Sequence, residues 1–320
     1  MTNVLITGGA GFIGSHLTER LLKEGSRVIC LDNFDTFYDP QIKRENIQSF
    51  LSDKNYTLIE GDIRDLKLLT DIFSGKKPDV IVHIAARAGV RPSIKEPLLY
   101  LDVNIRGTAN LLEMAKDYKV KKFIFASSSS VYGENKKVPF SEEDNVDCPI
   151  SPYAATKKAG ELVCFTYHHL YNIPVVCLRF FTVYGPGQRP EMAIHKFTRM
   201  IYEGRSIPVY GDGTSKRDYT YINDIIAGIA SSIHKEFAYE IINLGESQTV
   251  GLMELISLIE ENLQKKAVIE WLPIQPGDVP ITYADIDKAR RLLAYAPCVN
   301  IKEGINRFVT WFLEREKRRE

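Results

Sequence analysis

Short runs of apolar, mostly β-branched residues recur along the first part of the chain, and helix-like stretches separate them. Strands that alternate with helices form βαβ units, and such units build a parallel sheet. The runs are apolar nearly throughout, which is typical of strands covered on both faces. The sequence therefore predicts an α/β fold with a doubly wound parallel sheet. The runs are VLIT from Val4, VICLD from Val28, TLIEGD from Thr57, VIVHIAA from Val80, FIFASSSS from Phe123 and VVCLRF from Val175.

The composition of the sequence changes after about Thr182, where predicted loops that contain proline and glycine become frequent. At 320 residues, the chain is long enough for about two domains. We expect residues 1–181 to form the sheet domain and residues 182–320 to form mainly a second, smaller substrate domain. Segments near residues 220–245 are predicted to return to the sheet domain.

Charge and cysteine usage narrow the class of protein. The 41 basic and 41 acidic residues give a formal net charge of zero. This provides no overall field for gathering polyanions, which argues against a binder of nucleic acid or of anionic membranes. The five cysteines include no C-x-x-C pair, so we expect no disulfides and no metal site, and a cytoplasmic location. No apolar run approaches the roughly 18 residues of a membrane span.

A glycine-rich segment, TGGAGFIG from Thr7, joins the first predicted strand to a predicted helix. Its glycines satisfy two nucleotide-binding spacings, one starting at Gly8 and one at Gly9, and both include Gly11 and Gly14. Such a turn lets the backbone approach a pyrophosphate closely, at the positive end of the helix. Because it lies between a strand and a helix, the motif predicts a dinucleotide site.

Two aspartates at strand ends are candidates for holding the adenosine half of the dinucleotide. Asp32 lies 18 residues after Gly14, where an acid accepts hydrogen bonds from the ribose and repels a 2′-phosphate. This favours NAD over NADP. Asp62 is a candidate for the adenine amino group, and the alternative for both is an ordinary strand-end or loop-capping aspartate. The predicted cofactor-binding residues are Gly8, Gly11, Phe12, Ile13, Gly14, Asp32, Asn33, Asp62, Ile63 and Lys157.

Tyr153 and Lys157 stand four residues apart in SPYAATK, so they share one face of a predicted helix. To act as a base near neutral pH, a tyrosine must lower its pKa from about 10 by roughly three units, or about 4 kcal/mol. The lysine ammonium and a positive nicotinamide ring are charges that could supply this. A chance pair is the alternative. The serine run from Ser127 ends a strand at the ligand-binding edge of the sheet, or forms a polar strand-to-loop junction.

Together these features resemble the extended short-chain dehydrogenase/reductase superfamily, and within it the sugar-nucleotide epimerases and dehydratases. The motifs occur in the family's order: TGGAGFIG, HIAARAGVRPS, VNIRGT, ASSSSVYG, SPYAATK, LRFFTVYGPGQRP and GDGTSKRDYTYINDI. The resemblance implies a Rossmann domain that binds NAD, with Tyr153 as the base and Lys157 as its pKa partner and ribose ligand. It also implies a hydrogen-bonding hydroxyl at Ser128, with Ser130 close by. It further implies a homodimer formed by helices near residues 105–118 and 153–171.

The serine run also bears on the reaction. The family's dehydratases carry Asp-Glu at the positions of Ser129 and Ser130, and its decarboxylating members carry Glu at the second position. Expelling water needs a proton donor and a base beyond the tyrosine, and two serines supply no carboxyl group. The pattern favours 4-epimerisation, in which Tyr153 removes the C4 hydroxyl proton as hydride leaves C4 for NAD. The transient 4-keto sugar then turns over and takes the hydride back from bound NADH.

The second half of the chain resembles the family's UDP-sugar site: Arg217 resembles the diphosphate-binding arginine, Tyr210 the aromatic residue on uracil, and Asp278 the ribose ligand. FTVYGPGQRPEMA resembles the UDP-glucuronate 4-epimerases, which implies conversion of UDP-glucuronate to UDP-galacturonate. Arg189 and Thr182 could hold the C6 carboxylate by charge-assisted hydrogen bonds. The predicted substrate-binding residues are Arg91 and Ser93, expected near the same end of the pocket, with Ser128, Tyr153, Thr182, Arg189, Tyr210, Arg217 and Asp278.

Other functions stay open at this point. Thr182 could be an ordinary loop threonine, and Arg189 could pair only with Glu191. Thr282 matches a position where some hexose epimerases carry a bulky gate residue, so UDP-N-acetylglucosamine remains an alternative substrate, as does UDP-glucose. A non-catalytic NAD-sensing regulator of the same fold would have lost the tyrosine and the lysine that this chain keeps.

Overall fold

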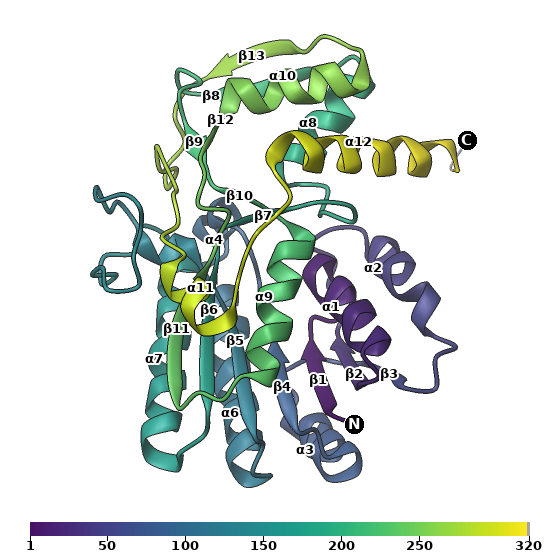
Figure 1. Ribbon diagram of the computed structural model, residues 1–320, viewed down its shortest axis with the longest axis vertical. Coiled ribbons are helices and arrows are strands. Elements are labelled where there is room, and N and C mark those ends of the chain that lie inside the picture. Colours follow the sequence, from purple (N-terminus) through teal and green to yellow (C-terminus); the bar gives the residue numbers. More distant parts are fainter. Residues whose placement is uncertain (319–320) are drawn as a thin grey trace.

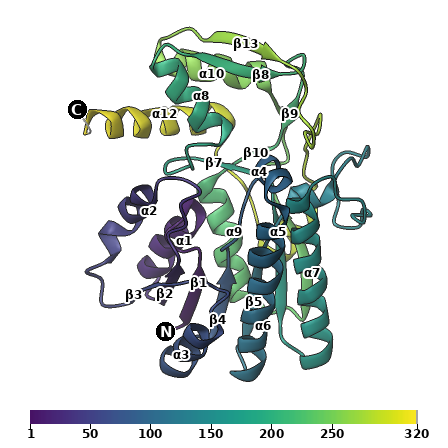
Figure 2. The same cartoon turned by 180° about the vertical axis from the view of Figure 1, so that it is seen from behind.

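The computed structural model describes residues 1–318 and contains a seven-stranded parallel sheet flanked by helices (Figures 1 and 2). Its strands are β1 (Asn3–Thr7), β2 (Arg27–Asp32), β3 (Tyr56–Glu60), β4 (Val80–His83), β5 (Lys122–Ser128), β6 (Val175–Phe180) and β11 (Tyr239–Leu244). The strand order is β11-β6-β5-β4-β1-β2-β3, so the order reverses beside β1. The predicted doubly wound α/β fold is confirmed.

Helices on both faces explain why the strands are apolar nearly throughout. Along β1, the side chains of Val4 and Ile6 belong to one core cluster, and that of Leu5 belongs to the other. Among the helices of the first cluster are two that pack on the sheet, and the second cluster includes residues of three other helices. These helices are α1 (Phe12–Lys23) and α9 (Ile222–His234) for the first cluster, and α3 (Leu66–Lys76), α6 (Gly107–Asp117) and α7 (Pro152–Tyr171) for the second.

Shorter helical segments follow the carboxyl ends of β2, β4 and β5, and those after β4 lead into α6, whereas those after β2 lead into β3. They place loop residues at the sheet edge where ligands bind in this class of fold. The segments are α2 (Pro40–Ile47), η1 (Gln48–Phe50), α4 (Val90–Lys95), α5 (Pro97–Leu101), the π-helical turn η2 (Asp102–Arg106) and η3 (Ser129–Tyr132).

A second lobe lies beyond the carboxyl edge of the sheet, at the top of Figure 1. It contains the parallel pair β8 (Ser206–Tyr210) and β13 (Val268–Leu272), with α8 (Ala193–Tyr202), α10 (Leu252–Leu263) and α12 (Ile301–Lys317). Two small pairs connect the lobes: β7 (Thr182–Tyr184) with β10 (Tyr219–Tyr221), and β9 (Lys216–Arg217) with β12 (Val250–Gly251).

Part of the second half of the chain returns to the sheet. β11 pairs in parallel with β6 from Tyr239 opposite Val175 to Leu244 opposite Phe180, and α9 lies beside α1. α11 (Asp287–Leu293) packs next to β11. The expected domain boundary at residue 181 stays a prediction, although β7 begins at the next residue.

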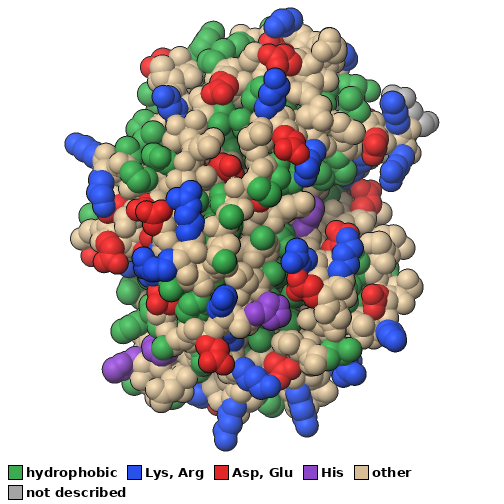
Figure 3. All heavy atoms as spheres, viewed as in Figure 1, with side chains coloured by type: hydrophobic (Ala, Val, Ile, Leu, Met, Phe, Trp, Pro, Cys, Tyr) green, Lys and Arg blue, Asp and Glu red, His purple; other side chains and the backbone are tan. Residues whose placement is uncertain are grey.

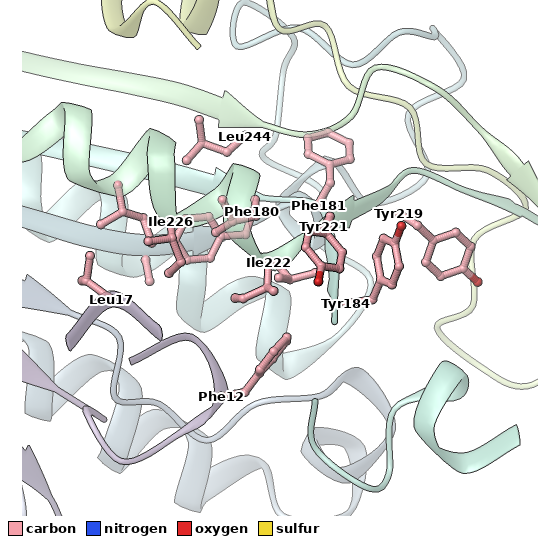
Figure 4. Packing of buried hydrophobic residues seen from close by; sticks show 14 of the residues in the cluster. Phe12, Leu17, Phe180, Phe181, Tyr184, Tyr219, Tyr221, Ile222, Ile226 and Leu244 are labelled. Carbon is pink, nitrogen blue, oxygen red and sulfur yellow. The ribbon is translucent and has the colours of Figure 1, made fainter. Parts of the chain in front are cut away.

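An aromatic junction joins the two lobes (Figure 4). The ring of Tyr184 meets those of Tyr219 and Tyr221 edge to face, with ring centres 6.2 and 5.6 Å apart. Edge-to-face pairs of buried rings stabilise such a contact beyond the area that they bury. The junction therefore holds the second lobe over the carboxyl edge of the sheet.

The surface mixes charges of both signs, as the sequence predicts. On the face shown in Figure 3, basic and acidic side chains are interspersed. Within residues 1–318, the five cysteines are free thiols, and no three potential metal ligands lie close enough to form a metal site. The same residues include no helix that is both long and apolar enough to span a bilayer.

Candidate active site

A large cavity lies at the carboxyl edge of the sheet, where the strand order reverses. Ligands bind at this place in doubly wound sheets. The cavity extends from the glycine loop after β1 and the ends of β2 and β3 to the serine run after β5 and the start of β7. The fold therefore brings most of the sequence motifs into one cleft.

The glycine loop leaves room that any larger residue would fill. Gly8 has a φ of +69°, and a Cβ atom on Gly14 would lie 2.3 Å from the Gly8 carbonyl oxygen. α1 begins at Phe12, and its N-cap Gly11 has no side chain to bond the first amide groups. Those N–H groups are available to a phosphate. The loop, with Ile13 also lining the cavity, therefore fits a dinucleotide pyrophosphate.

Asp32 ends β2 and is buried beside this loop. Each of its carboxylate oxygens accepts one backbone N–H, from Ala10 at 3.1 Å and from Phe34 at 2.9 Å. A carboxylate oxygen has two lone pairs, so Oδ2, which already accepts the Ala10 N–H, can accept a further bond from a ribose hydroxyl. The Lys43 ammonium lies 3.5 Å from Asp32 and also lines the cavity. Sequence analysis missed Lys43 because a lysine within α2 belongs to no motif.

Asp62 and Asn33 meet at the same end of the cavity, where Nδ2 of Asn33 donates to Asp62 at 3.0 Å. Arg64 binds the Asp62 carboxylate through Nε at 2.9 Å and Nη2 at 2.7 Å, and these bonds lower the pKa of Asp62 to about 2. Asp62 is thus ionised near neutral pH and can accept a bond from an amino group. Ile63 lines the cavity next to it.

The N-terminus of α7 positions Tyr153 and Lys157. Ser151 caps the helix, because its hydroxyl accepts a hydrogen bond from the Ala154 amide at 3.1 Å. One turn apart on the helix, Lys157 Nζ and the centre of the Tyr153 ring are 5.9 Å from each other. Lys157 donates to the Ala126 carbonyl at 2.6 Å, and burial lowers the pKa of its ammonium to about 8.

Burial raises the pKa of Tyr153, whereas a hydrogen bond with Ser128 and the positive charge of Arg189 lower it. The sequence predicts that Lys157, together with a nicotinamide ring, lowers this pKa. In the structure the Lys157 ammonium binds a backbone carbonyl, and its effect on Tyr153 stays a prediction. The phenol needs a further positive charge before it can act as a base near neutral pH. A nicotinamide ring in the cavity is a group that could provide it.

The serine run is held from two sides. Ser128 Oγ donates to Ser130 Oγ at 3.1 Å and accepts the Ser130 N–H at 3.1 Å. Ser127 donates to Glu161 at 2.6 Å, and Glu161 forms a buried ion pair with Arg179 through two bonds of 2.9 Å each. This pair fixes the end of β5 beside the cavity. Sequence analysis missed it because no local pattern links a glutamate in α7 to an arginine in β6.

Thr182 and Arg189 line the end of the cavity that holds Tyr153. Nη1 of Arg189 lies 3.1 Å from Glu191, which is the pairing that the sequence offered as an alternative role. The guanidinium also faces the cavity, 5.8 Å from the centre of the Phe37 ring. Arg189 therefore brings a positive charge to this end, whether or not it also orders its own loop.

Arg87 is a second guanidinium in the cavity, and sequence analysis missed it. It lies 5.0 Å from the centre of the Phe37 ring and pairs with Asp35 at 2.5 Å and Glu96 at 3.1 Å. Its backbone N–H donates to Asn104 at 2.8 Å. The arginine belongs to the segment HIAARAGVRPS, so its position after β4 is the signal that could have found it.

Arg91 and Ser93, which the sequence predicts near the sugar end of the pocket, are not among the residues that line the cavity. Ser93 is fully buried and donates to the Val90 carbonyl at 2.6 Å. Arg91 donates to Asp278 at 2.7 Å, and its guanidinium lies 4.3 Å from the centre of the Tyr210 ring. In this segment of the chain, Val90 is the last residue that lines the cavity, and α4 starts there. Arg91 thus lies among the residues predicted to bind uridine.

A glycine cradle, strand-end carboxylates and a tyrosine–lysine pair at the switch point of a doubly wound sheet define a dinucleotide-dependent short-chain dehydrogenase/reductase. Within this class, the chain belongs to the family described as GDP-mannose 4,6 dehydratase, which it matches over residues 5–308. The predicted extended branch of the superfamily is confirmed.

Known relatives are similar over nearly the whole chain. A UDP-glucuronate 4-epimerase of Thermodesulfobacterium geofontis is 45% identical over 97% of this chain and 96% of that protein. The crystal structure of UDP-glucuronic acid 4-epimerase from Bacillus cereus, in complex with UDP-glucuronic acid and NAD, is 39% identical with a TM-score of 0.91, covering 98% of this chain and 99% of that one. A UDP-glucose 4-epimerase of Thermotoga maritima, solved with UDP-glucose, is 33% identical with a TM-score of 0.91, covering 98% and 100%.

Proposed function

We propose that this chain is an NAD-dependent 4-epimerase that interconverts UDP-glucuronate and UDP-galacturonate. The observation that carries the proposal is the placement of Arg189, which faces the cavity at the end that holds Tyr153 and acts on its pKa. A guanidinium there suits a sugar that carries a carboxylate close to its reacting carbon. The names of the relatives from Thermodesulfobacterium geofontis and Bacillus cereus agree with this substrate.

The glycine loop, Asp32, Asp62 and Lys157 are the groups that would hold NAD. The loop offers backbone N–H groups to the pyrophosphate, and Asp32 offers lone pairs to the adenosine ribose. The 2.6 Å bond of Lys157 to Ala126 leaves the ammonium two more N–H donors for the other ribose. When bound, NAD supplies a reversible acceptor for the hydride of C4.

The residues of the chain move the proton. Tyr153 takes the proton from the C4 hydroxyl as C4 is oxidised, and returns it once C4 has been reduced on the opposite face. Ser128, hydrogen-bonded to Tyr153 and to Ser130, orients the same hydroxyl. Between the two steps, the 4-keto sugar must turn over in the cavity.

The carboxylate needs separate control, because a 4-keto glucuronate is a β-keto acid and loses CO₂ readily. Charge-assisted bonds from Arg189, together with the Thr182 hydroxyl, would hold the carboxylate as an anion while the ring turns. The serines at positions 129 and 130 carry no carboxyl group that could drive water expulsion. Epimerisation without elimination or decarboxylation is the outcome that this set of side chains favours.

UDP-glucose is the second candidate substrate, because the structural similarity to the Thermotoga maritima UDP-glucose 4-epimerase has the same TM-score. UDP-N-acetylglucosamine also stays open through Thr282, which is buried and hydrogen-bonded to the Asp218 amide at 3.2 Å. The deciding experiment assays UDP-glucuronate, UDP-glucose and UDP-N-acetylglucosamine side by side. We expect the highest kcat/KM for UDP-glucuronate. A protein that converts none of them, and shows no reduced nicotinamide by absorbance, would instead be an NAD-sensing regulator.

We also propose that the enzyme is a homodimer that acts in the cytoplasm. The interface predicted from the sequence uses the helices near residues 105–118 and 153–171. Exposed large apolar side chains lie on the second of these, α7, and on α5, which precedes the first, and they offer a surface to a second copy. Free thiols agree with a reducing compartment. Sedimentation that shows a monomer at micromolar concentration would contradict the dimer. The exposed side chains are Leu98, Leu101, Leu162, Phe165, Leu170 and Tyr171.

A further inference from the structure

A strap, residues 273–281, runs from the end of β13 in the second lobe to the bridge of Ile281 with Lys216, and it contains Asp278, one of the residues predicted to bind uridine. Gly277 in the strap approaches Val90 so closely that an added Cβ atom would lie 2.8 Å from Val90 Cγ1. Ile281 then forms a bridge with Lys216 next to Arg217. The strap therefore contacts α4 of the sheet lobe on one side and β9 on the other.

Arg91 is the charged link between α4 and this strap. Its Nη2 donates to Asp278 Oδ2 at 2.7 Å, and its guanidinium lies 4.3 Å from the centre of the Tyr210 ring. Both contacts cross from the sheet lobe to the second lobe. One side chain thus engages the last residue of β8 and the acidic residue of the strap together.

This arrangement conflicts with a bound uridine. Tyr210 and Asp278 are the residues expected to stack on uracil and to bind its ribose, and Arg91 occupies both of them. A planar guanidinium and a nucleobase compete for the same aromatic face. A uridine nucleotide that uses these two residues must therefore displace Arg91.

The charges nearby indicate where the displaced guanidinium would go. Arg217 donates to the carbonyls of Lys216 and Pro280, at 2.8 and 3.3 Å. Burial lowers the pKa of Arg217, the charge of Arg91 acts in the same direction, and Asp278 opposes both. Of the two guanidiniums, only that of Arg91 pairs with the Asp278 carboxylate, and Arg217 lies close enough for both charges to act on its pKa. A diphosphate that enters beside them would add negative charge to this excess of positive charge.

We propose that Arg91 is a latch for the nucleotide end: it binds Tyr210 and Asp278 when the cleft is empty of substrate, and it moves onto the diphosphate when a UDP-sugar enters. The inference rests on the proposed function, because it takes UDP as the carrier of the sugar. Arg91 is a positioning residue in this scheme and takes no part in the proton transfer.

The test measures binding of UDP and of uridine by calorimetry to the NAD-saturated protein. In Arg91→Ala, the affinity for UDP should fall about tenfold or more, because a charge-assisted bond to the diphosphate is lost. The affinity for uridine should stay the same or rise, because Tyr210 and Asp278 are already free. Lys95→Ala removes the same charge from the same helix and should change neither affinity. For UDP-glucuronate, Arg91→Ala should raise KM and leave kcat unchanged.

A second variant, Arg91→Lys, separates the two halves of the proposal. Lysine keeps the charge for the diphosphate but lacks the planar group that covers Tyr210, so it should recover most of the UDP affinity. Equal weakening of UDP and uridine in Arg91→Ala would overturn the latch and make Arg91 a support of the local fold. Tighter binding of both ligands, no change in either, or the same losses in Lys95→Ala would overturn it too.

These outcomes remain distinct from failure of the proposed epimerase. A protein that binds UDP with the expected Arg91 dependence but epimerises no UDP-sugar would keep the latch and lose the proposed reaction. An active epimerase whose UDP affinity ignores Arg91 would keep the reaction and lose the latch. Wild-type protein that binds neither UDP nor uridine would overturn both.

Discussion

The two halves of the cleft are formed by different kinds of chemical group. The cofactor half consists of backbone, glycines and buried strand ends, such as Asp32 with its two backbone hydrogen bonds. The sugar-nucleotide half consists of long charged side chains on loops from both lobes, and these pair with one another, as Arg91 does with Asp278 and Arg189 with Glu191. The first half is preformed, whereas in our proposal the second exchanges its ion pairs for contacts with substrate.

This difference fits the chemistry of an epimerase. No net oxidation occurs in the cycle, so the dinucleotide can stay in a rigid site, while UDP-sugars must enter and leave at every turnover. Preformed contacts lower the ordering cost of a ligand that stays. Exchangeable ion pairs keep the charged groups partnered while no ligand is bound.

The largest loss of activity is expected from a change at Tyr153, which lies where the two halves of the cleft meet. Tyr153→Phe keeps the ring and removes the proton acceptor, so turnover should fall by about two to four orders of magnitude. NAD content and UDP affinity should be unchanged, because both halves of the cleft are intact. Initial rates and bound cofactor are measured on the same preparation. More than about a tenth of wild-type activity would be incompatible with the role of base.

The next effect tests the rigidity of the cofactor half. In Gly14→Ala, the new Cβ atom would lie 2.3 Å from the backbone oxygen of Gly8, which cannot move without distorting the loop. We expect a loss of stability of about 1–3 kcal/mol and little or no bound NAD. Denaturant midpoints and cofactor content after purification measure the two effects.

Gly75→Ala in α3 is the matched control, because a Cβ atom there meets nothing within 4 Å. This change should stabilise the protein by up to about 1 kcal/mol and leave NAD bound. If both variants retain the cofactor equally, the glycine loop can shift to accept a Cβ atom, and the cofactor half is not rigid.

The cofactor half could be predicted from the sequence more fully than the sugar-nucleotide half. Gly8, Asp32, Tyr153 and Lys157 stand in contiguous motifs whose place after a strand or on a helix follows from the local pattern. The fold and the family are therefore confirmed as predicted. The cofactor and substrate named for the solved relatives agree with the predicted ones.

The sugar-nucleotide half was harder to predict, because its residues meet only through the packing of two lobes. Arg91 follows the cavity-lining Val90 by one residue, yet α4 directs it to Tyr210 and Asp278. The Glu161–Arg179 pair is likewise long-range, since it depends on α7 lying against β6. Such contacts have no periodicity or spacing that a single sequence displays.

A smaller effect tests the exchangeable half. Arg189→Ala removes one charge-assisted contact of about 1.5 to 3 kcal/mol, so kcat/KM for UDP-glucuronate should fall roughly 10- to 150-fold. UDP-glucose has no carboxylate, so it should lose only the smaller part of the effect that comes from the charge of Arg189 on the Tyr153 pKa. Comparing kcat/KM for both sugars in both proteins isolates the carboxylate contact.

Glu191→Gln provides the control for this prediction. It breaks the ion pair of Arg189, which measures 3.1 Å, but keeps the guanidinium in place. The variant should retain most of its preference for the acidic sugar. If Arg189→Ala weakens both sugars equally, and Glu191→Gln does the same, the arginine only orders its loop, and UDP-glucose becomes the leading substrate.

The smallest effect concerns His83, which lies under the cofactor loop. Its Nδ1 is 2.7 Å from the Thr7 hydroxyl and its Nε2 is 2.9 Å from the Thr108 hydroxyl, and burial lowers its pKa to about 3. Between pH 6.5 and about 3, the unfolded chain binds a proton that the folded chain does not, so stability falls as the pH falls through this window.

Between pH 6.5 and 5.5, uptake of this proton by the unfolded chain should lower the free energy of unfolding by roughly 1 kcal/mol. Urea denaturation at the two pH values, with NAD saturating, measures the slope. His83→Gln should flatten it, because no group then gains a proton on unfolding at this site. His234→Gln, which removes an exposed imidazole near Glu24, should leave the slope unchanged. If the slopes of wild type and His83→Gln agree, His83 gains its proton in the folded protein as well. The core beneath the glycine loop would then be open to water, and the cofactor half would not be the rigid, closed site described above.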